Sequence, residues 1–149
     1  MPPRRWAHGS GLSVRTNGYT ARGNHVYNFG SSAGIFVYPV GTPYADMLFE
    51  NNLVHDAITR TVVLNDIGEN VVLRNNTFIG GVDGYFWEDG DGSGLHLYNN
   101  VFGHLTVWYP SQLPNIHEGR NILQYINTRS PWSRDAAFPE GSTSLMLGY

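Results

Sequence analysis

Apolar and polar residues alternate in short segments along this chain, and one such segment recurs in nearly the same frame. Three copies read MLFENNLV from Met47, VVLRNNTF from Val71 and LHLYNNVF from Leu95. The alternation has the two-residue period of a half-buried β-strand, and these copies lack the helical spacing of about 3.6 residues. The second asparagine of each pair recurs at an interval of 24 residues, at Asn52, Asn76 and Asn100. The pattern therefore predicts an internal repeat of short strands.

Weaker copies of the segment extend the repeat toward both ends of the chain. YTARGNHV begins at Tyr19 and supplies Asn24, and IHEGRNIL begins at Ile116 and supplies Asn121. A second column of short apolar segments lies between the copies, at residues 12–14, 35–37, 62–64, 85–87 and 105–107. A unit of about 20 to 28 residues is shorter than a strand–helix–strand crossover of about 30 residues. The spacing predicts one coil of a β-solenoid per repeat.

The repeated asparagines indicate one particular corner of each coil. Where successive coils stack about 4.8 Å apart, identical amide side chains at a corner can hydrogen-bond along the stack. Asparagine also tolerates the left-handed backbone conformation that a sharp corner requires. We therefore expect a ladder of stacked amides formed by Asn24, Asn52, Asn76, Asn100 and Asn121.

In these residues the chain resembles the right-handed parallel β-helix proteins of the pectate-lyase-like superfamily, whose coils read apolar-x-apolar-x-Asn-Asn-x-apolar. The resemblance covers roughly residues 11–127. It implies an all-β fold, a short right-handed parallel β-helix solenoid of about four to five coils with an irregular C-terminal tail. It implies function only in outline, because the superfamily includes polysaccharide lyases, glycoside hydrolases, epimerases, phage tailspikes and adhesins.

The repeat predicts a single domain over residues 1–149 with three parts. Residues 1–10 form an N-terminal cap or arm, residues 11–127 form the coils, and residues 128–149 form a C-terminal tail or cap. Solenoid ends need covering, so the apolar residues 145–147 must fold back over the last coil or pack on another chain. We therefore expect a homo-oligomer. The N-terminal segment lacks the apolar core of a signal peptide, and the location stays open, with an extracellular one suggested by the resemblance.

Composition narrows the classes of function. The 18 glycines and 14% charged residues suit a turn-rich β-solenoid, and the net charge of −3 argues against a nucleic-acid partner. The chain has no cysteine, which excludes disulfides and thiolate metal sites, and it has no apolar run long enough to cross a membrane. All nine basic residues are arginines, so a lysine general base is excluded and an arginine base would need special activation.

Alternation along the repeat also predicts which side chains face outward. One exposed column then contains Arg22, Glu50, Arg74 and Tyr98, and a neighbouring column places His96 beside His117. Charges of opposite sign on adjacent coils can pair as a surface ladder. The alternative is a groove in which the arginines and Tyr98 bind an acidic sugar. The histidine pair is a candidate metal or acid–base site, although no third ligand lies in register.

The outer edge of the second column is rich in carboxylates and aromatic rings. The pairs that follow its strands are Tyr38-Pro39, Asn65-Asp66, Glu88-Asp89 and Trp108-Tyr109. Carboxylates accept hydrogen bonds from sugar hydroxyls while aromatic rings cover the apolar sugar face, so these acidic and aromatic residues are candidate sugar ligands. Asp66, Glu88 and Asp89 are also catalytic candidates, because Asp66 and Asp89 one coil apart approach the separation of about 5–5.5 Å of a retaining glycosidase pair. The alternative is that both segments are acidic, glycine-rich turns.

Two further clusters are candidates for binding or catalysis. The loop EDGDGSG presents Glu88, Asp89 and Asp91, an oxygen cluster of the kind that Ca²⁺ accepts, although the EF-hand pattern is missing and a solvated turn is the alternative. Apart from this loop and the pair of His96 and His117, no cofactor or metal is expected. A second polar patch contains residues 27–28, 55–56 and 104, and His55 beside Asp56 is an acid–base candidate.

These observations favour a carbohydrate-binding β-helix module that resembles polysaccharide-active β-helix proteins, with a polysaccharide or oligosaccharide as partner and with catalysis left open. A structural or adhesive oligomeric β-helix, similar to a tailspike, is the alternative from another class. A glycoside hydrolase or polysaccharide lyase is the third hypothesis.

Overall fold

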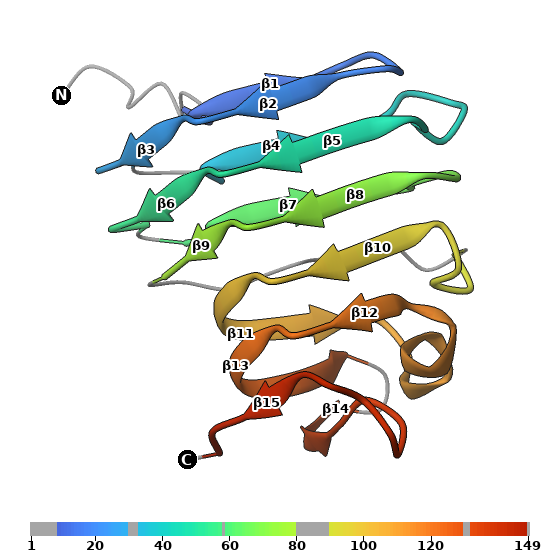
Figure 1. The fold of residues 1–149 in the computed structure, drawn as a ribbon. Helices are drawn as coiled ribbons and strands as arrows, with labels where there is room; N and C mark the ends of the chain where they lie inside the picture. Colours follow the sequence, from blue (N-terminus) through green and yellow to red (C-terminus); the bar gives the residue numbers. More distant parts are fainter. Residues whose placement is uncertain (1–8, 30–32, 58, 80–89, 130–131, 149) are drawn as a thin grey trace, which may run out of the picture.

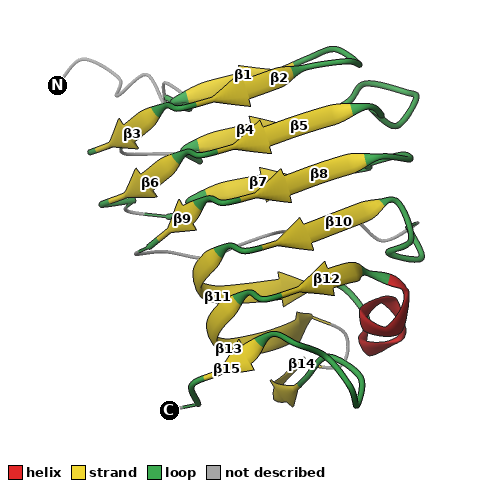
Figure 2. Ribbon diagram, in the orientation of Figure 1, coloured by secondary structure: helices red, strands yellow, loops and turns green. Residues whose placement is uncertain are grey.

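A computed structural model describes residues 9–29, 33–57, 59–79, 90–129 and 132–148. The described chain is nearly all β, with short strands, tight turns and one 3₁₀-helix, η1 (Pro110–Asn115) (Figure 2). The strands stack along one axis and build a β-solenoid of about five turns, in which every described strand pairing is parallel except that of the last two long strands (Figure 1). The all-β solenoid predicted from the repeat is therefore confirmed.

The strands form three sheets, which we name A, B and C. Sheet A contains β1 (Leu12–Val14), β4 (Ile35–Val37) and β7 (Val62–Leu64). Sheet B contains β2 (Thr20–Arg22), β5 (Met47–Glu50), β8 (Val71–Arg74), β10 (Leu95–Tyr98) and β12 (His117–Gly119). Sheet C contains β3 (His25–Tyr27), β6 (Leu53–His55), β9 (Thr77–Phe78), β11 (Val101–Val107), β13 (Ile122–Arg129), β14 (Trp132–Ala136) and β15 (Leu145–Met146).

Sheet C is a feature that the two-column prediction missed. The two predicted columns correspond to sheets A and B, and the three strands of sheet A have the predicted bounds. The residues that follow each asparagine pair start a further strand, because the corner redirects the chain. The predicted strand at residues 105–107 is the C-terminal half of β11. The predicted strand at residues 85–87 lies outside the described residues.

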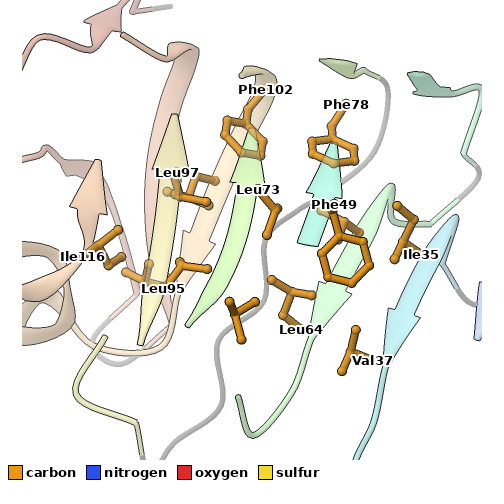
Figure 3. Close-up of a cluster of buried hydrophobic side chains, with 14 of the residues drawn as sticks. Ile35, Val37, Phe49, Leu64, Leu73, Phe78, Leu95, Leu97, Phe102 and Ile116 are labelled. Atoms are coloured by element: carbon orange, nitrogen blue, oxygen red, sulfur yellow. The ribbon is translucent and has the colours of Figure 1, made fainter. Parts of the chain in front are cut away.

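Rows of like residues fill the interior (Figure 3). The inward positions of sheet B form two rows that are at most 1% exposed, Met47, Val71 and Leu95 in one and Phe49, Leu73 and Leu97 in the other. Phe78 and Phe102 of sheet C stack with ring centroids 5.4 Å apart. Full burial of one such side chain contributes about 1.5–3 kcal/mol, so these rows hold the coils together.

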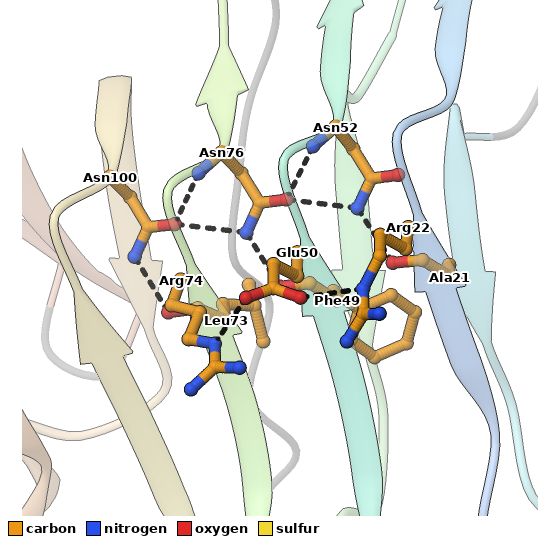
Figure 4. A network of polar contacts seen from close by, with 9 residues as sticks. All are labelled: Ala21, Arg22, Phe49, Glu50, Asn52, Leu73, Arg74, Asn76 and Asn100. Carbon is orange, nitrogen blue, oxygen red and sulfur yellow. Dashed lines mark hydrogen bonds and ion pairs between the residues drawn. The ribbon is translucent and has the colours of Figure 1, made fainter.

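The predicted asparagine ladder is present at the corner between sheets B and C (Figure 4). The Oδ1 atom of Asn76 accepts hydrogen bonds from the backbone N–H and the Nδ2 of Asn52, at 3.0 and 2.9 Å. Its own Nδ2 donates to Oδ1 of Asn100 and to the backbone oxygen of Phe49. Asn76 is 1% exposed. Each coil therefore satisfies the polar groups of this buried corner through the next coil.

The left-handed conformation at this corner belongs to the residue before each ladder asparagine. Positive φ angles occur at Gly23, Asn51, Asn75, Asn99 and Arg120. The two members of each Asn-Asn pair thus have separate roles: the first bends the backbone and the second bonds along the stack. Arg120 is the exception, because an arginine with φ of 55° has no side-chain preference for this region.

The C-terminal tail is more regular than the predicted irregular segment. Strand β15 pairs in parallel with β13, and Ser144 takes the ladder position next to Asn121. The Ser144 hydroxyl accepts from Asn121 and donates to the Glu118 carboxylate in a short hydrogen bond. Phe138 is buried against the main core, so part of the tail covers the last coil. The ladder ends at this serine, whose hydroxyl donates its only proton to Glu118 and not to a further coil.

Candidate functional site

A cleft of about 370 Å³ opens where the corner between sheets A and B meets helix η1. It lies between the turn that follows β7 and the segment that precedes β10. The side chains and backbone that line it are Asp66, Ile67, Gly68, Glu69, Gly90, Asp91, Gly92, Ser93, Gly94, Leu95 and Gln112. Its volume falls in the range of about 300–1,000 Å³ that small-molecule sites occupy. The predicted candidates Asp66 and Asp91 therefore share one concave site.

Glycines at two positions let the walls of this cleft approach each other. A Cβ atom on Gly94 would lie 2.0 Å from the backbone oxygen of Gly68 on the preceding coil. Gly92 has a φ of 92°, and a Cβ atom there would lie 2.5 Å from the backbone oxygen of Gln112. Other residues would force the backbone apart at both positions. The glycine-rich sequence before β10 therefore sets the shape of the cleft.

Gln112 fastens helix η1 to the cleft. Its side chain is buried, and its Oε1 accepts hydrogen bonds from the backbone N–H groups of Trp108 and Tyr109 at 2.9 and 3.0 Å. Its Nε2 donates to the backbone oxygen of Gly90 at 2.6 Å. Sequence reasoning missed Gln112, because a glutamine in a proline-containing turn carries no periodic signal. The position of Pro110 at the start of η1 was the available clue to a helical turn there.

Asp91 is held as a charged hydrogen-bond acceptor. Its Oδ1 accepts from the Ser93 hydroxyl at 2.6 Å and from the Ser93 backbone N–H at 2.8 Å. The hydroxyl bond first, and the backbone bond second, lower the pKa of Asp91, although partial desolvation acts against them. Asn115 of η1 donates to the backbone oxygen of Asp91 at 3.0 Å. The carboxylate is therefore positioned and ionised at neutral pH.

The charge of the cleft decides which ligands suit it. Asp66, Glu69 and Asp91 contribute three carboxyl groups, and the described lining contains no arginine. A negative cleft disfavours an acidic sugar and suits a ligand with many hydroxyl donors or a cation. The predicted candidates Glu88 and Asp89 lie outside the described residues. The glycosidase pair of Asp66 and Asp89 and the Ca²⁺ cluster of Glu88, Asp89 and Asp91 therefore stay predictions.

Trp108 and Tyr109 adjoin this cleft through their backbone, and their side chains are absent from its described lining. The Trp108 ring packs with Phe36 against a second apolar cluster of Ala33 and Val63. The Arg129 guanidinium lies 5.6 Å from the centre of the Trp108 ring. The aromatic residues and the described carboxylates thus occupy neighbouring surfaces, and a shared sugar site built from both stays a prediction.

The outer face of sheet B has the register that the repeat predicts. Arg22 aligns with Glu50, Glu50 with Arg74, and Arg74 with Tyr98. Glu50 pairs with the Nε of Arg22 at 2.6 Å and with the Nε of Arg74 at 2.7 Å (Figure 4). The surface-ladder interpretation therefore accounts for both arginines, and sugar binding by Arg74 and Tyr98 stays a prediction.

Glu50 is the most buried member of this ladder, with a side chain that is 11% exposed. Burial acts to raise its pKa, but the hydrogen bond from Arg74 and the charges of Arg22 and Arg74 outweigh burial. The pKa of Glu50 therefore lies below its ordinary value of 4.5. Because both arginines are exposed, water partly screens the attraction between their charges and that of Glu50.

Histidines on the surface take part in two kinds of contact, one with another histidine and one with a carboxylate. His96 and His117 align across β10 and β12, and their rings stack with centroids 4.6 Å apart and an interplanar angle of 9°. Burial first, and the charge of His117 second, lower the pKa of His96. In the second polar patch, Nδ1 of His55 lies 2.9 Å from Oδ2 of Asp56. In the described part of the chain, no group of three or more His, Asp or Glu side chains is arranged to hold a metal ion.

Comparison of the chain with family models, with curated proteins and with solved structures found no significant match. Within the residues that the structure describes, no helix is long and apolar enough to cross a membrane.

Proposed function

We propose that this chain is a carbohydrate-binding β-helix module, of the kind that the pectate-lyase-like resemblance implies, and that the cleft beside η1 binds a neutral oligosaccharide or polysaccharide segment. The observation that carries this proposal is the gathering of Asp66, Glu69 and Asp91 around one cleft of about 370 Å³. Sugars present hydroxyl donors at close spacing, and ionised carboxylates are the strongest acceptors that a protein offers them.

The shape of the cleft supports the same ligand class. Backbone at Gly90, Gly92 and Gly94 lines the wall without side chains, so a ring with many hydroxyls can approach the main chain closely. Gln112 holds η1 against the loop in a fixed position. A site whose acceptors are already in place loses less free energy to ordering when the ligand binds.

Binding without catalysis is the role that fits Asp91 best. A glycoside hydrolase needs one carboxyl that is protonated at working pH to donate a proton to the leaving oxygen. The pKa of Asp91 is lowered by Ser93, which makes Asp91 an acceptor and a poor proton donor. The lyase hypothesis lacks a lysine base, since the chain contains no lysine. Either catalytic hypothesis would have to rest on Asp66, on Glu69 or on residues outside the described ones.

The test of this proposal is a glycan array followed by titration of the best-bound neutral oligosaccharide. Asp66→Asn and Asp91→Asn should each weaken binding by about 10-fold or more, because a hydrogen bond to a charged group contributes about 1.5–3 kcal/mol. Asp56→Asn is the matched control, since Asp56 is an exposed carboxylate on the sheet C side that does not line the cleft. Binding that both cleft variants retain in full, or no retention of any glycan, would overturn the proposal.

A second candidate is the structural or adhesive oligomer, and one observation favours it. A column of outward residues crosses sheet C in register, namely His25, Leu53, Thr77, Val101, Ile122 and Leu145. Leu53, Ile122 and Leu145 are 39%, 40% and 55% exposed. A second copy of this chain presents the same column, so a two-fold axis would place apolar residues of both copies against each other.

Light scattering tests this oligomer at micromolar concentration. We expect a mass above that of one chain, and Ile122→Lys should reduce it to the monomer because a charge would enter the apolar contact. Val40→Lys is the control, since Val40 is 79% exposed in a loop away from sheet C. A monomeric mass for the unsubstituted chain would contradict the oligomer and leave the sugar proposal standing.

A further inference from the structure

Two histidines on adjacent coils point their ring nitrogens at each other on the surface of sheet C. His25 lies on β3 and His55 on β6, where His55 is the register partner of Tyr27. The two Nε2 atoms are 2.7 Å apart. The Tyr27 ring stacks on His55 with centroids 5.7 Å apart and lies 4.7 Å from the His25 ring. These contacts restrict the rotation of both imidazoles, so their nitrogens already converge.

Asp56 contacts the second ring nitrogen of His55. Its carboxylate lies 2.9 Å from Nδ1 of His55, which keeps the proton on Nδ1 and leaves the lone pair on Nε2. Asp56 takes a left-handed φ of 53°, and this bend brings the carboxylate back to the ring that precedes it. Histidines that bind metals commonly have a carboxylate on the second ring nitrogen, because the carboxylate orients the ring and strengthens the ligand.

The separation of the nitrogens is close to what a shared metal ion needs. Two imidazole nitrogens at about 2.0–2.1 Å from a tetrahedral ion are roughly 3.3 Å apart. His25 is exposed and the side chain of His55 is 29% exposed, so both rings can move outward by the small difference. An ion would take the place of the single proton that now lies between the two nitrogens, and that proton would move to Nδ1 of His25, which leaves the Nε2 lone pair of His25 free to bind.

We propose that His25 and His55 bind a divalent transition-metal ion of the imidazole-preferring kind, with Asp56 as the outer partner of His55 and water in the remaining positions. The expected order of affinity is Cu²⁺ above Ni²⁺, with Zn²⁺ below Cu²⁺. With only two protein ligands the site is open to solvent, which leaves positions for a further ligand. The proposal is independent of the sugar-binding cleft, because none of its residues lines that cleft.

The chain contains a matched control in its other histidine pair. His96 and His117 are also on adjacent coils, but their rings lie face to face at 4.6 Å, so they stack instead of pointing nitrogens at each other. A second difference is that, among the residues that the structure describes, no carboxylate forms an ion pair with either of these rings as Asp56 does with His55. Removal of His117 should therefore leave metal binding intact.

The test is calorimetric titration of the full chain with Ni²⁺ and Zn²⁺, together with the paramagnetic resonance spectrum of one equivalent of Cu²⁺. We expect one saturable site in the unsubstituted chain, a Cu²⁺ spectrum with two nitrogen ligands, and loss of the site in His25→Ala and in His55→Ala. Asp56→Asn should weaken binding by about 10- to 100-fold. His25→Gln is a second variant that preserves a hydrogen bond to His55 and guards against loss of folding.

The outcomes separate clearly. Retention of the site in His117→Ala with loss in the His25 and His55 variants supports the proposal. Absence of saturable binding, retention in both His25 variants, or loss in His117→Ala would overturn it. The melting temperature of each variant without metal shows that the chain is folded, and its rise with Zn²⁺ in the unsubstituted chain gives an independent readout.

Discussion

The two corners that flank sheet B differ in how faithfully they repeat. At the corner with sheet C, each coil places an amide at the same point, and the bonds from Asn52 to Asn76 and from Asn76 to Asn100 have nearly equal lengths. At the corner on the other side of sheet B, the connecting segments differ from coil to coil: residues 38–46 and 65–70 follow strands of sheet A, and residues 108–116 follow β11. The ladder amides of the first corner are buried, and the second corner carries the cleft beside η1.

The two corners therefore contribute to different properties. The corner between sheets B and C contributes to stability, and the corner beside η1 contributes to the chemistry of the surface. A buried polar corner is stable only when each group is satisfied by the coil above and the coil below, so any departure from the repeat is costly. At the corner beside η1, water can satisfy the polar groups, so that corner tolerates carboxylates, glycines and a helical turn. We therefore expect substitutions at the corner between sheets B and C to change the free energy of unfolding, and substitutions at the corner beside η1 to change ligand binding.

The largest effect is expected at the centre of the ladder. Asn76→Ala removes the acceptor of the Asn52 backbone N–H and one of the acceptors of Asn52 Nδ2, and it should lower the free energy of unfolding by about 1–3 kcal/mol. Chemical denaturation measures this change. Asn75→Gly is the control, because Asn75 is exposed and glycine adopts its left-handed conformation readily. Equal stability of Asn76→Ala and the unsubstituted chain would refute the ladder.

A smaller loss of stability is expected when Gln112, which fastens η1 to the cleft, is replaced. Gln112→Ala removes the bonds to Gly90, Trp108 and Tyr109 and should cost about 1–2 kcal/mol. Hydrogen exchange should become faster in η1 and stay unchanged at the asparagine corner. Exchange that accelerates equally at both corners would show that the two corners do not open independently.

A pH-dependent effect is expected from the ladder on sheet B. Since the folded pKa of Glu50 lies below its ordinary value of 4.5, its ion pairs stabilise the fold above that pH and are lost as pH falls through the folded value. The melting temperature of Glu50→Gln should therefore fall below that of the unsubstituted chain at neutral pH and converge with it in acid. A gap that widens as the pH falls would contradict the pairing, and added salt should narrow the neutral gap.

The smallest effect is a gain in stability at the last coil. Arg120 occupies the left-handed position that glycine or asparagine fills on the other coils. Arg120→Asn should raise the free energy of unfolding by up to about 1 kcal/mol, because asparagine pays less for this conformation. Thermal melting measures the change, and a loss of stability would mean that the arginine side chain contributes a contact that outweighs the backbone cost.

The fold was largely predictable because alignment of the repeated asparagines gives the register between strands of adjacent coils. Once Asn52, Asn76 and Asn100 are aligned, the positions of Arg22, Glu50 and Arg74 follow by counting, and the structure has this alignment. Sheet C was missed because its first three strands after the corner, β3, β6 and β9, are only two or three residues long. Ser144 was missed because a hydroxyl replaces the expected amide at the last step of the ladder.

The candidate site was less predictable, for physical reasons. Asp66 was named from its place after a predicted strand and Asp91 from an acidic, glycine-rich loop, but their shared cleft depends on η1, whose position follows from the bonds of Gln112 and not from any repeat. The contact between His25 and His55 spans 30 residues, whereas the register partners of this coil are 28 apart, so the pair is diagonal and counting along the repeat does not find it.

The most direct test of the division between the two corners is a nuclear magnetic resonance titration of the labelled chain with a neutral oligosaccharide chosen from the glycan array. We predict that backbone amide signals shift at residues 66–69 and 90–94 and at η1, while the amides of Asn52, Asn76 and Asn100 keep their positions. Shifts centred on the asparagine corner or on the face of sheet B, with none at the cleft, would contradict the account.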